Sequence, residues 1–207
     1  MSKIKRMSKI KRICVYCGSG SGNDPAYTAA ARQFGEILAR NKIRLIFGCG
    51  STGLMGTLAR AVHDHGGEIT GVIPEFLKAQ ERLFRDADEV IVTADMHERK
   101  RLMFERADAF VALPGGIGTL EELVEQLTWA QLGRHKKPIL LANVGGFWDP
   151  LITVFEHLRS SAFLPGGGPL AYIAVDAVEK ILPAAAAALA HVEESELEGE
   201  PERVRRL

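Results

Sequence analysis

The sequence predicts a single α/β domain with a doubly wound, Rossmann-like sheet of about seven strands, mostly parallel, and with helices on both faces. Short apolar runs alternate with segments of helical period, at a spacing of roughly 25 residues. Most of these runs, such as Ile13–Tyr16 and Leu45–Phe47, are apolar at every position, which is typical of parallel strands covered on both sides. The 207 residues suffice for one well-filled core.

The expected elements follow one another along the chain. Strands are expected at Arg12–Cys17, Arg44–Phe47, Ile69–Ile73, Glu89–Thr93, Ala109–Leu113, Ile139–Ala142 and Tyr172–Val175, where the apolar runs lie. Helices are expected at Pro25–Asn41, Leu54–His65, Asp95–Arg106, Thr119–Gly133, Trp148–Ser161 and Asp176–Ala190. An apolar stripe of Leu120, Leu123, Val124 and Leu127 supports the fourth of these helices, and the alanine run at 184–188 supports the last.

The two ends of the chain differ in composition from the segment between them. Residues 1–11 form a basic extension that is expected to be flexible, and Met-Ser-Lys-Ile-Lys-Arg occurs twice in tandem over Met1–Arg12. This extension could serve as a nucleic-acid arm, but a duplicated start or an expression artefact explains the repeat better. The domain is expected at 12–191, and the charged segment 192–207 is expected to be a flexible tail.

The composition excludes several classes of function. The net charge is +0 with 25% charged and 46% hydrophobic residues, so nucleic-acid and membrane partners are not expected. The chain has no apolar run long enough to span a membrane and no signal-peptide pattern. Three cysteines suggest reduced thiols, and a cytoplasmic location is expected. Cys14 and Cys17 should point to opposite faces of their strand, and the histidine spacing indicates no metal site.

The most informative stretch is 113–122, which reads Leu-Pro-Gly-Gly-Ile-Gly-Thr-Leu-Glu-Glu. It joins an apparent buried strand to a helix through a glycine-rich turn, and the free N–H groups at such a helix start bind anions. Glu122 lies one turn inside that helix. A pure phosphate site gains nothing from a carboxylate there, whereas an enzyme that stabilises a developing cation beside a phosphate does. The alternative is that Thr119 and Glu122 form a capping box.

A second charged segment, Asp95–Arg101, begins the helix expected after the fourth strand. It therefore lies at the carboxyl-terminal end of the sheet, as does the glycine-rich turn after the fifth strand. Asp95 and Glu98 also fit a helix N-cap and its partner, so Arg99 could simply belong to a solvated helix end. The two segments follow consecutive strands, and this shared position favours a common site for Arg99 and Glu122.

The glycines at 48–53 match the dinucleotide fingerprint G-x-G-x-x-G, with Glu75 in place for a ribose-binding acid. However, the fingerprint normally follows the first strand, and here Pro74 precedes the acid. The glycines could equally permit a tight turn or form one wall of a mononucleotide cleft. The possible cleft-wall residues are Gly18, Ser19, Gly48, Gly50, Thr52 and Gly53.

Pro-Gly-Gly-x-Gly-Thr-x-x-Glu at 114–122, together with Met-His-x-Arg-Lys at 96–100, resembles the LOG (Lonely Guy) family of cytokinin riboside 5′-monophosphate phosphoribohydrolases. The similarity covers residues 12–190. It implies a homodimer with a Rossmann-like fold that hydrolyses the N-glycosidic bond of a purine nucleoside 5′-monophosphate, one with an N6-modified adenine, to free base and ribose 5-phosphate. Relatives have often been labelled lysine decarboxylases, but nothing in this sequence suggests a pyridoxal site, and no cofactor is expected.

The resemblance marks Arg99 and Glu122 as the catalytic pair. The substrate-binding residues that it implies are Glu81, Arg99, Lys100, Gly115, Gly116, Ile117, Gly118, Thr119, Leu120, Glu121 and Thr128. The segment around Glu81 departs from the usual Met-Pro-Arg-Glu and matches in position alone. Cys49 departs from an expected run of three glycines, and its thiol could narrow the pocket.

The residues fit this chemistry independently, because cleavage of a ribosyl C–N bond passes through a cationic, oxocarbenium-like state. Glu122 could stabilise that charge and orient or deprotonate a water molecule. Arg99 could contact phosphate or ribose oxygens and fix Glu122. The sequence identifies no general acid for the leaving base. The remaining alternatives are a nucleotide- or dinucleotide-binding protein without hydrolase activity, and a dimeric carrier or regulatory module for another phosphorylated ligand.

Overall fold

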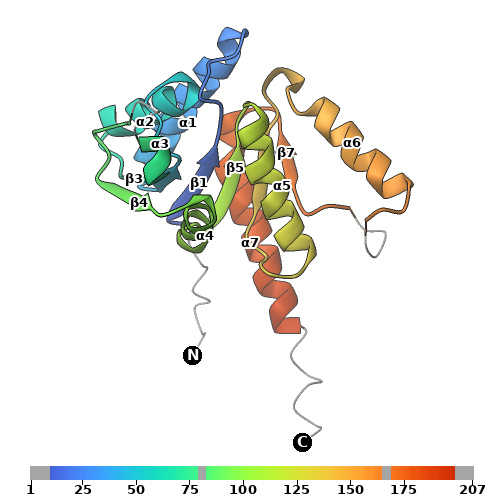
Figure 1. The fold of residues 1–207 in the computed structure, drawn as a ribbon. Helices are drawn as coiled ribbons and strands as arrows, with labels where there is room; N and C mark the ends of the chain where they lie inside the picture. Colours follow the sequence, from blue (N-terminus) through green and yellow to red (C-terminus); the bar gives the residue numbers. More distant parts are fainter. Residues whose placement is uncertain (1–9, 79–82, 165–168, 199–207) are drawn as a thin grey trace, which may run out of the picture.

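The computed structural model describes residues 10–78, 83–164 and 169–198, with side chains as far as residue 192, and shows one sheet between two layers of helices (Figure 1). The strands are β1 (Arg12–Tyr16), β2 (Arg44–Phe47), β3 (Ile69–Pro74), β4 (Glu89–Thr93), β5 (Ala109–Ala112), β6 (Ile139–Ala142) and β7 (Ile173–Val175). The helices are α1 (Pro25–Arg40), α2 (Gly53–Asp64), α3 (Glu75–Lys78), α4 (Met96–Arg106), α5 (Ile117–Gln131), α6 (Asp149–Ser160) and α7 (Ile181–Glu198), with the 3₁₀ turns η1 (Val144–Gly146) and η3 (Val178–Lys180).

The sheet has seven strands in the order β4-β3-β2-β1-β5-β6-β7, and every neighbouring pair is parallel. The chain first adds strands outward from β1 to β4 and then returns to place β5 on the other side of β1. The order therefore reverses between β1 and β5, which is where ligands bind in doubly wound sheets. The prediction of a Rossmann-like parallel sheet with about seven strands is confirmed.

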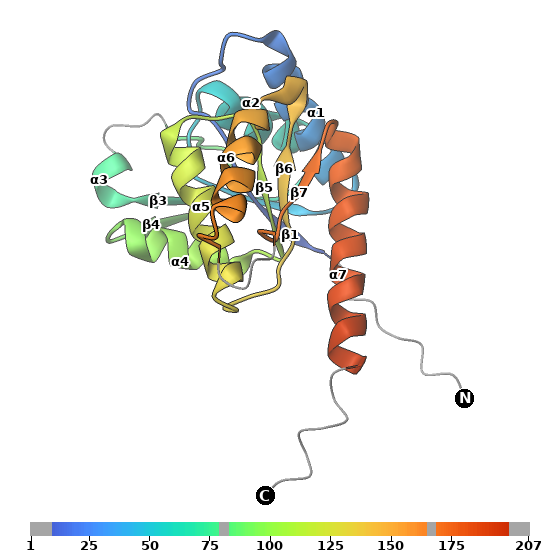
Figure 2. The same ribbon diagram turned by 90° about the vertical axis from the view of Figure 1, so that its right-hand side faces the viewer.

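Helices cover both faces of the sheet, as Figure 2 shows. Helices α1, α2 and α7 pack on one face through residues such as Phe34, Leu58 and Ile181, and they enclose one apolar core. Helices α4, α5 and α6 cover the other face. Cys14 lies in the second core and Cys17 in the first, so the two thiols point to opposite faces, as expected. Both are fully buried within apolar surroundings, which raises the pKa of each thiol.

Most expected boundaries agree with the structure to within one residue, the short α3 and η1 were not expected, and three differences are more informative. Helix α5 begins at Ile117, two residues before the expected start, because the backbone is already helical immediately after Gly116. The single helix expected from Asp176 to Ala190 is divided into η3 and α7, and α7 continues to Glu198. At the other end, Ile10 is buried in the core and the Lys11 amide donates to Asp108 at 3.0 Å.

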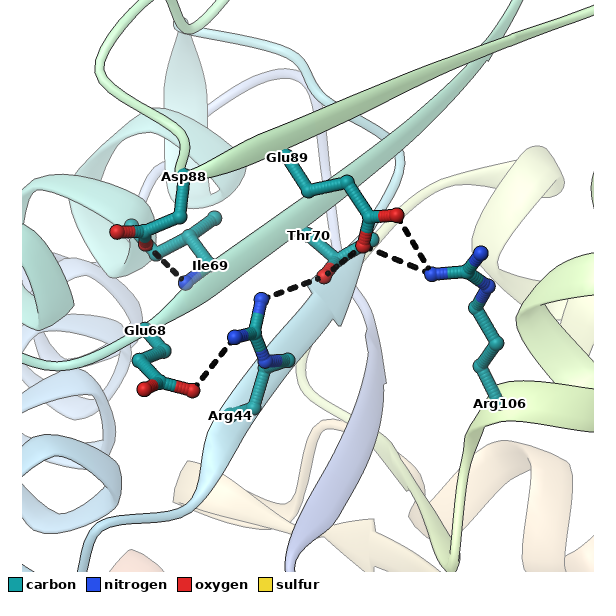
Figure 3. A network of polar contacts seen from close by, with 7 residues as sticks. All are labelled: Arg44, Glu68, Ile69, Thr70, Asp88, Glu89 and Arg106. Carbon is teal, nitrogen blue, oxygen red and sulfur yellow. Dashed lines mark hydrogen bonds and ion pairs between the residues drawn. The ribbon is translucent and has the colours of Figure 1, made fainter.

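Polar side chains close the amino-terminal ends of three strands (Figure 3). Arg44 donates to Thr70 and to Glu68, and Thr70 donates to Glu89 at 3.0 Å. One nitrogen of Arg106 donates to both carboxylate oxygens of Glu89, at 2.9 and 2.8 Å. Burial opposes ionisation of Glu89, but the hydrogen bonds from Arg106 and Thr70 outweigh it and lower the pKa of that carboxyl. This network lies at the amino-terminal end of the strands, and the glycine-rich turns lie at the opposite, carboxyl-terminal end.

Candidate functional site

The turn at Pro114–Gly116 connects β5 to α5 at the point where the strand order reverses. The Gly18 amide, just beyond β1, donates to the Pro114 carbonyl at 3.1 Å and ties the two strand ends together. A Cβ atom on Gly115 would lie 2.2 Å from the Thr119 hydroxyl and 2.9 Å from the Gly18 nitrogen, so the turn closes only around a glycine. Gly116 caps α5 without a side-chain acceptor, which leaves the first amides of the helix available to an anion.

A cleft of about 320 Å³ opens above this turn. Its lining comes from the β1–α1 loop and Tyr27 of α1, the turn that precedes α5, Leu54 of α2, and Phe147 just after η1. Tyr27 and Phe147 close one end with an edge-to-face ring contact at 5.4 Å between centroids. The lining residues are Gly18, Ser19, Gly20, Ser21, Gly22, Asn23, Tyr27, Leu54, Pro114, Gly115, Gly116 and Phe147. Much of the cleft surface is apolar, but the amides of its glycines and the hydroxyls of Ser19 and Ser21 also line it, and these groups suit a phosphate.

Glu122 lies on the side of α5 that faces α4, with only 13% of its side chain exposed. Its Oε1 atom is 3.3 Å from Nη1 of Arg99, but the contact does not have hydrogen-bond geometry, and this buried oxygen receives no hydrogen bond within the described residues. Burial raises the pKa of Glu122 to about 7, although Arg99 acts to lower it. A carboxyl with this pKa changes its charge near neutral pH.

The two helix-capping alternatives have different outcomes. Gly116, and not Thr119, is the N-cap of α5, so the capping-box interpretation of Glu122 is wrong. In α4 the N-cap does form, because Asp95 accepts from the Glu98 amide, and Glu98 reaches back to accept from the amide of Ala94, one residue before the cap. Arg99 nevertheless takes no part in that cap, and its side chain is only 12% exposed.

Arg99 is held in place from several sides. Its Nε atom donates to the Val72 carbonyl at 3.1 Å, and its Nη1 atom donates to the sulfur of Met96. A Cβ atom on Gly48 would lie 2.4 Å from its Nη2 atom. Gly48, at the end of β2, therefore provides the space that the guanidinium occupies beside Glu122. Val72 lies within β3, so segments far apart in the sequence together position this one side chain.

Lys100 follows Arg99 on α4 and forms ion pairs with two other glutamates of α5. Its Nζ atom is 2.6 Å from Glu121 and 2.9 Å from Glu125. Burial opposes the charge of Lys100, but these hydrogen bonds outweigh it and raise the pKa of the ammonium. With Arg99 and Glu122, the cluster has three carboxylates and two cations, so it carries an excess of negative charge when Glu122 is ionised.

The fingerprint-like glycines at 48–53 have structural explanations that require no dinucleotide. Gly53 has a left-handed φ of 57°, and a Cβ atom there would lie 2.2 Å from the Ser19 carbonyl oxygen. Thr52 donates to that same carbonyl at 3.2 Å. Gly50 forms an isolated bridge with Leu83. The acid expected to bind ribose, Glu75, begins the short helix α3 and pairs with Lys78 at 3.6 Å.

Cys49 is buried, and its thiol does not line the cleft. Its sulfur donates to the Phe84 carbonyl at 3.8 Å, and the Phe84 amide donates back to the Cys49 carbonyl. A Cβ atom on Gly71 would lie 2.4 Å from that sulfur. The thiol therefore packs between Gly71 and the segment before β4. Glu81, the remaining expected binding residue of this region, lies outside the described residues.

Thr128 is separated from the other expected substrate-binding residues. It lies twelve residues beyond Gly116 on α5, or roughly 18 Å along the helix axis. Its hydroxyl donates to the Val124 carbonyl, and its side chain lies on the exposed stripe that also carries Val124 and Leu132. Thr128 is not among the residues that line the cleft, and its role in substrate binding stays a prediction.

Two residues of the cluster were not among the sequence expectations. One is Glu125, which contacts Lys100. The other is Tyr16 at the end of β1, which lies near Glu122 and Glu125. Burial is the main cause that raises the pKa of the Tyr16 phenol, and the charges of these two glutamates raise it further. The position of Glu125 four residues after Glu121 is a signal that could have identified it, since both then face α4. Tyr16 offered no such signal, because it reads as an ordinary strand residue. The described residues contain no group of three potential metal ligands, and none of their helices is long and apolar enough to cross a membrane.

Comparison with known proteins gives consistent matches. A family model described as possible lysine decarboxylase matches residues 55–184. Cytokinin riboside 5′-monophosphate phosphoribohydrolase LOG7 of Arabidopsis thaliana is 50% identical over 157 residues, which are 76% of this chain and 72% of that protein. The probable phosphoribohydrolase LOG6 of the same plant is 48% identical over 160 residues, covering 77% and 80%. The molybdenum cofactor carrier protein of Chlamydomonas reinhardtii superimposes with a TM-score of 0.66 at 22% identity, covering 88% and 99%, which shows a shared fold.

Proposed function

This chain belongs to the LOG family of cytokinin riboside 5′-monophosphate phosphoribohydrolases, whose family model is described as possible lysine decarboxylase, and we propose that it is an N-glycosyl hydrolase. Its substrate is a purine nucleoside 5′-monophosphate that carries an N6-modified adenine. The products are the free base, a cytokinin, and ribose 5-phosphate. The observation that carries this proposal is the buried Arg99–Glu122 pair beside an anion-binding turn.

The 5′-phosphate occupies the cleft above the first turn of α5. The free amides at Gly116–Gly118 and the serine hydroxyls of the β1–α1 loop surround its oxygens. The helix dipole contributes roughly 0.3–1 kcal/mol, and up to about 2 kcal/mol when the anion is partly buried, so hydrogen bonds supply most of the binding energy. Because the phosphate is remote from the reacting bond, its binding energy serves to hold the ribose against Glu122.

Glu122 acts on the sugar. As the bond between C1′ and the purine nitrogen breaks, the bond electrons leave with the base and positive charge develops on the ribose. The ionised Glu122 stabilises that charge and accepts a proton from the water that attacks C1′. The departing base takes up a proton from solvent, and Glu122 then releases the proton of the attacking water to solvent, so that one water molecule is consumed in each turnover. Arg99 keeps the carboxylate aligned and presents its charge to ribose or phosphate oxygens.

The enzyme acts as a homodimer in this proposal. Ile117, Val124 and Leu132 form an exposed apolar stripe along α5, with 83%, 40% and 70% of their surfaces exposed. Thr128 lies on the same stripe and too far from its own cleft to contact substrate there, so it would act on the nucleotide of a second copy. No nucleic acid or membrane takes part. The three buried cysteines form no disulfide, which fits a cytoplasmic location.

The test is to incubate the protein with AMP, with isopentenyladenosine 5′-monophosphate and with the corresponding phosphate-free nucleosides, and to separate the products by chromatography. We expect release of base from both nucleotides, faster from the N6-modified one, and at least about a hundredfold less from the nucleosides because they lack the group that binds the turn. Binding of the nucleotides without release of base would overturn the proposal and favour a nucleotide-binding protein.

A further inference from the structure

The ammonium group of Lys100 is held between two carboxylates that differ in their surroundings. Both belong to α5 and are one helical turn apart, and their oxygens lie 2.6 Å (Glu121) and 2.9 Å (Glu125) from Nζ. The side chain of Glu121 is 52% exposed, whereas that of Glu125 is 21% exposed. Glu121 can therefore turn toward solvent or a ligand at little cost, and Glu125 cannot.

The second carboxylate oxygen of Glu125 is also enclosed by the protein. Oε2 is buried and receives no hydrogen bond from any described residue. A buried carboxylate oxygen without a donor is costly, so the ion pair with Lys100 must offset that cost for the side chain to stay in place. Such a contact fixes Lys100 against α5, because neither partner can move into solvent without leaving the other charge buried.

We propose that Glu125 is a positioning residue of the active site. Its ion pair with Lys100 persists and keeps Lys100 beside Glu122, whereas Glu121 releases Lys100 and contacts the substrate instead. The inference rests on the hydrolysis proposed above. It explains why the cluster contains a third glutamate, which the family resemblance did not mark. Glu125 acts through Lys100 and does not touch the substrate.

Glu125 also contributes to the charge around Glu122. The groups that interact electrostatically with Glu122 are Arg99 and Lys100 from α4, Glu121 and Glu125 from α5, and Cys14, Tyr16 and Cys17 in or just after β1. The thiols and the phenol are neutral because burial raises their pKa, so only the α4 and α5 groups bring charge. Loss of the Glu125 charge by itself lowers the pKa of Glu122, whereas release of Lys100, whose charge acts on Glu122 more strongly, raises it. The Glu125→Gln substitution should therefore raise the pKa of Glu122 and move the acid limb of the activity profile to higher pH.

The first test needs no catalysis. In ¹⁵N-labelled protein, the side-chain ammonium of Lys100 should give an NMR signal, because burial and two ion pairs slow its exchange with water. We expect this signal to survive in Glu121→Gln and to disappear in Glu125→Gln. If the Lys100 signal disappears equally in both variants, or in Glu121→Gln alone, then Glu125 is not the residue that holds Lys100 in place. This result stands whether or not the wild-type chain hydrolyses nucleotides.

The second test is a double-mutant cycle on nucleotide hydrolysis. Glu125→Gln should lower kcat/KM about tenfold, the effect of one lost charge-assisted contact. The same change made in Lys100→Met should have less than about a twofold effect, since the residue through which Glu125 acts is gone. If Glu125→Gln lowered kcat/KM by the same factor in Lys100→Met as in the wild-type protein, the result would contradict the proposal.

Glu105→Gln is the matched control, because it removes an exposed ion pair of α4, with Arg101 at 3.9 Å, away from the cluster. It should leave both kcat/KM and its pH profile unchanged. In Glu125→Gln the acid limb should move to higher pH because Lys100 is released, and a purely structural defect would not produce this shift. An acid limb that stays in place would overturn the electrostatic part of the inference.

Discussion

The two ends of the sheet each carry a network that contains an arginine–glutamate pair, but the two pairs differ in exposure and in how fully they are hydrogen-bonded. At the amino-terminal end, Glu89 and Arg106 are both 40% exposed, and the carboxylate accepts from Arg106 and Thr70. At the carboxyl-terminal end, Arg99 and Glu122 are 12% and 13% exposed, and one oxygen of Glu122 receives no hydrogen bond. A satisfied, half-exposed pair contributes to the fold at low cost. A buried, incompletely satisfied pair costs stability and is what an active site uses to keep a group reactive.

The pKa shifts of the two carboxyls follow from this difference and have opposite consequences. The pKa of Glu89 is lowered in the folded protein, so its contribution to stability is present above its ordinary pKa and is lost as the pH falls through the folded value. The pKa of Glu122 is raised from 4.5 to about 7, so the folded state holds a proton that the unfolded state has released. Stability therefore decreases as the pH rises from about 4.5 to 7.

Glu122→Gln should produce the largest effect on activity. We expect base release from the nucleotide to fall by roughly 10³-fold, because the amide can neither accept the proton of water nor stabilise the sugar cation as an anion does. The fold should be retained, since the substitution removes a buried charge. Chromatography of the products measures the rate. Full turnover in this variant would refute the role assigned to Glu122.

Gly48→Ala tests whether the site depends on the space provided by a distant strand. The new methyl group would lie 2.4 Å from the Arg99 guanidinium, so that side chain must move away from Glu122. We expect kcat/KM to fall roughly 10- to 100-fold, the cost of a small misplacement in an active site. Gly71→Ala is the comparison, because it places a methyl group equally close to the Cys49 sulfur.

The two alanine variants should separate strain from positioning. Both should lower Tm, but only Gly48→Ala should lose activity out of proportion to its stability. A parallel loss of activity and Tm in both variants would mean that Gly48 has a general packing role.

The pH dependence of hydrolysis should report the buried carboxyl. Below pH 7 we expect kcat/KM to rise about tenfold per pH unit and to level off near the Glu122 pKa of about 7. An exposed glutamate would give a midpoint near 4.5 instead. A flat profile between pH 5 and 8 would contradict the assignment of Glu122 as the group that must be ionised.

Glu89→Gln should have the smallest effect and completes the comparison. Because this pair is half-exposed, we expect the free energy of unfolding at neutral pH to fall by less than about 1 kcal/mol. The loss should shrink at acidic pH, where the wild-type carboxyl is also protonated. Denaturant titration at two pH values measures it, and hydrolysis should remain at the wild-type rate. A large loss of activity would mean that the two ends of the sheet are coupled.

Much of the fold could be predicted from local patterns. Seven apolar runs become the seven strands nearly residue for residue, because continuous burial leaves a clear pattern in parallel strands. The start of α5 was misplaced by two residues, because Thr119 resembles an N-cap when the backbone of Gly116 is not seen. That small shift decides the chemistry, since a helix beginning at Ile117 leaves Glu122 with no capping role.

The candidate site was only partly visible in the sequence. The motifs brought Arg99, Lys100 and Glu122 to one rim, and the structure places them within contact distance on α4 and α5. The contribution of Gly48 was hidden, because the spacing of its neighbours resembles a dinucleotide motif. Glu125 was missed because its significance depends on its distance from Lys100. Thr128, in contrast, lies far along α5 from the turn at Gly116, and its contact with substrate stays a prediction.

The sequence by itself determined which segments become strands and helices, the parallel class of the sheet, and the glycine turn that opens α5, because these depend on periodicity and on residues close together in the chain. Only the tertiary structure decided that α4 and α5 lie side by side and that Arg99 fills the space beside Gly48. It also decided that Glu122 is buried without a hydrogen bond on one oxygen, and so titrates near neutral pH. The reason is that desolvation and ion pairing depend on neighbours brought together from distant segments, which no local pattern records.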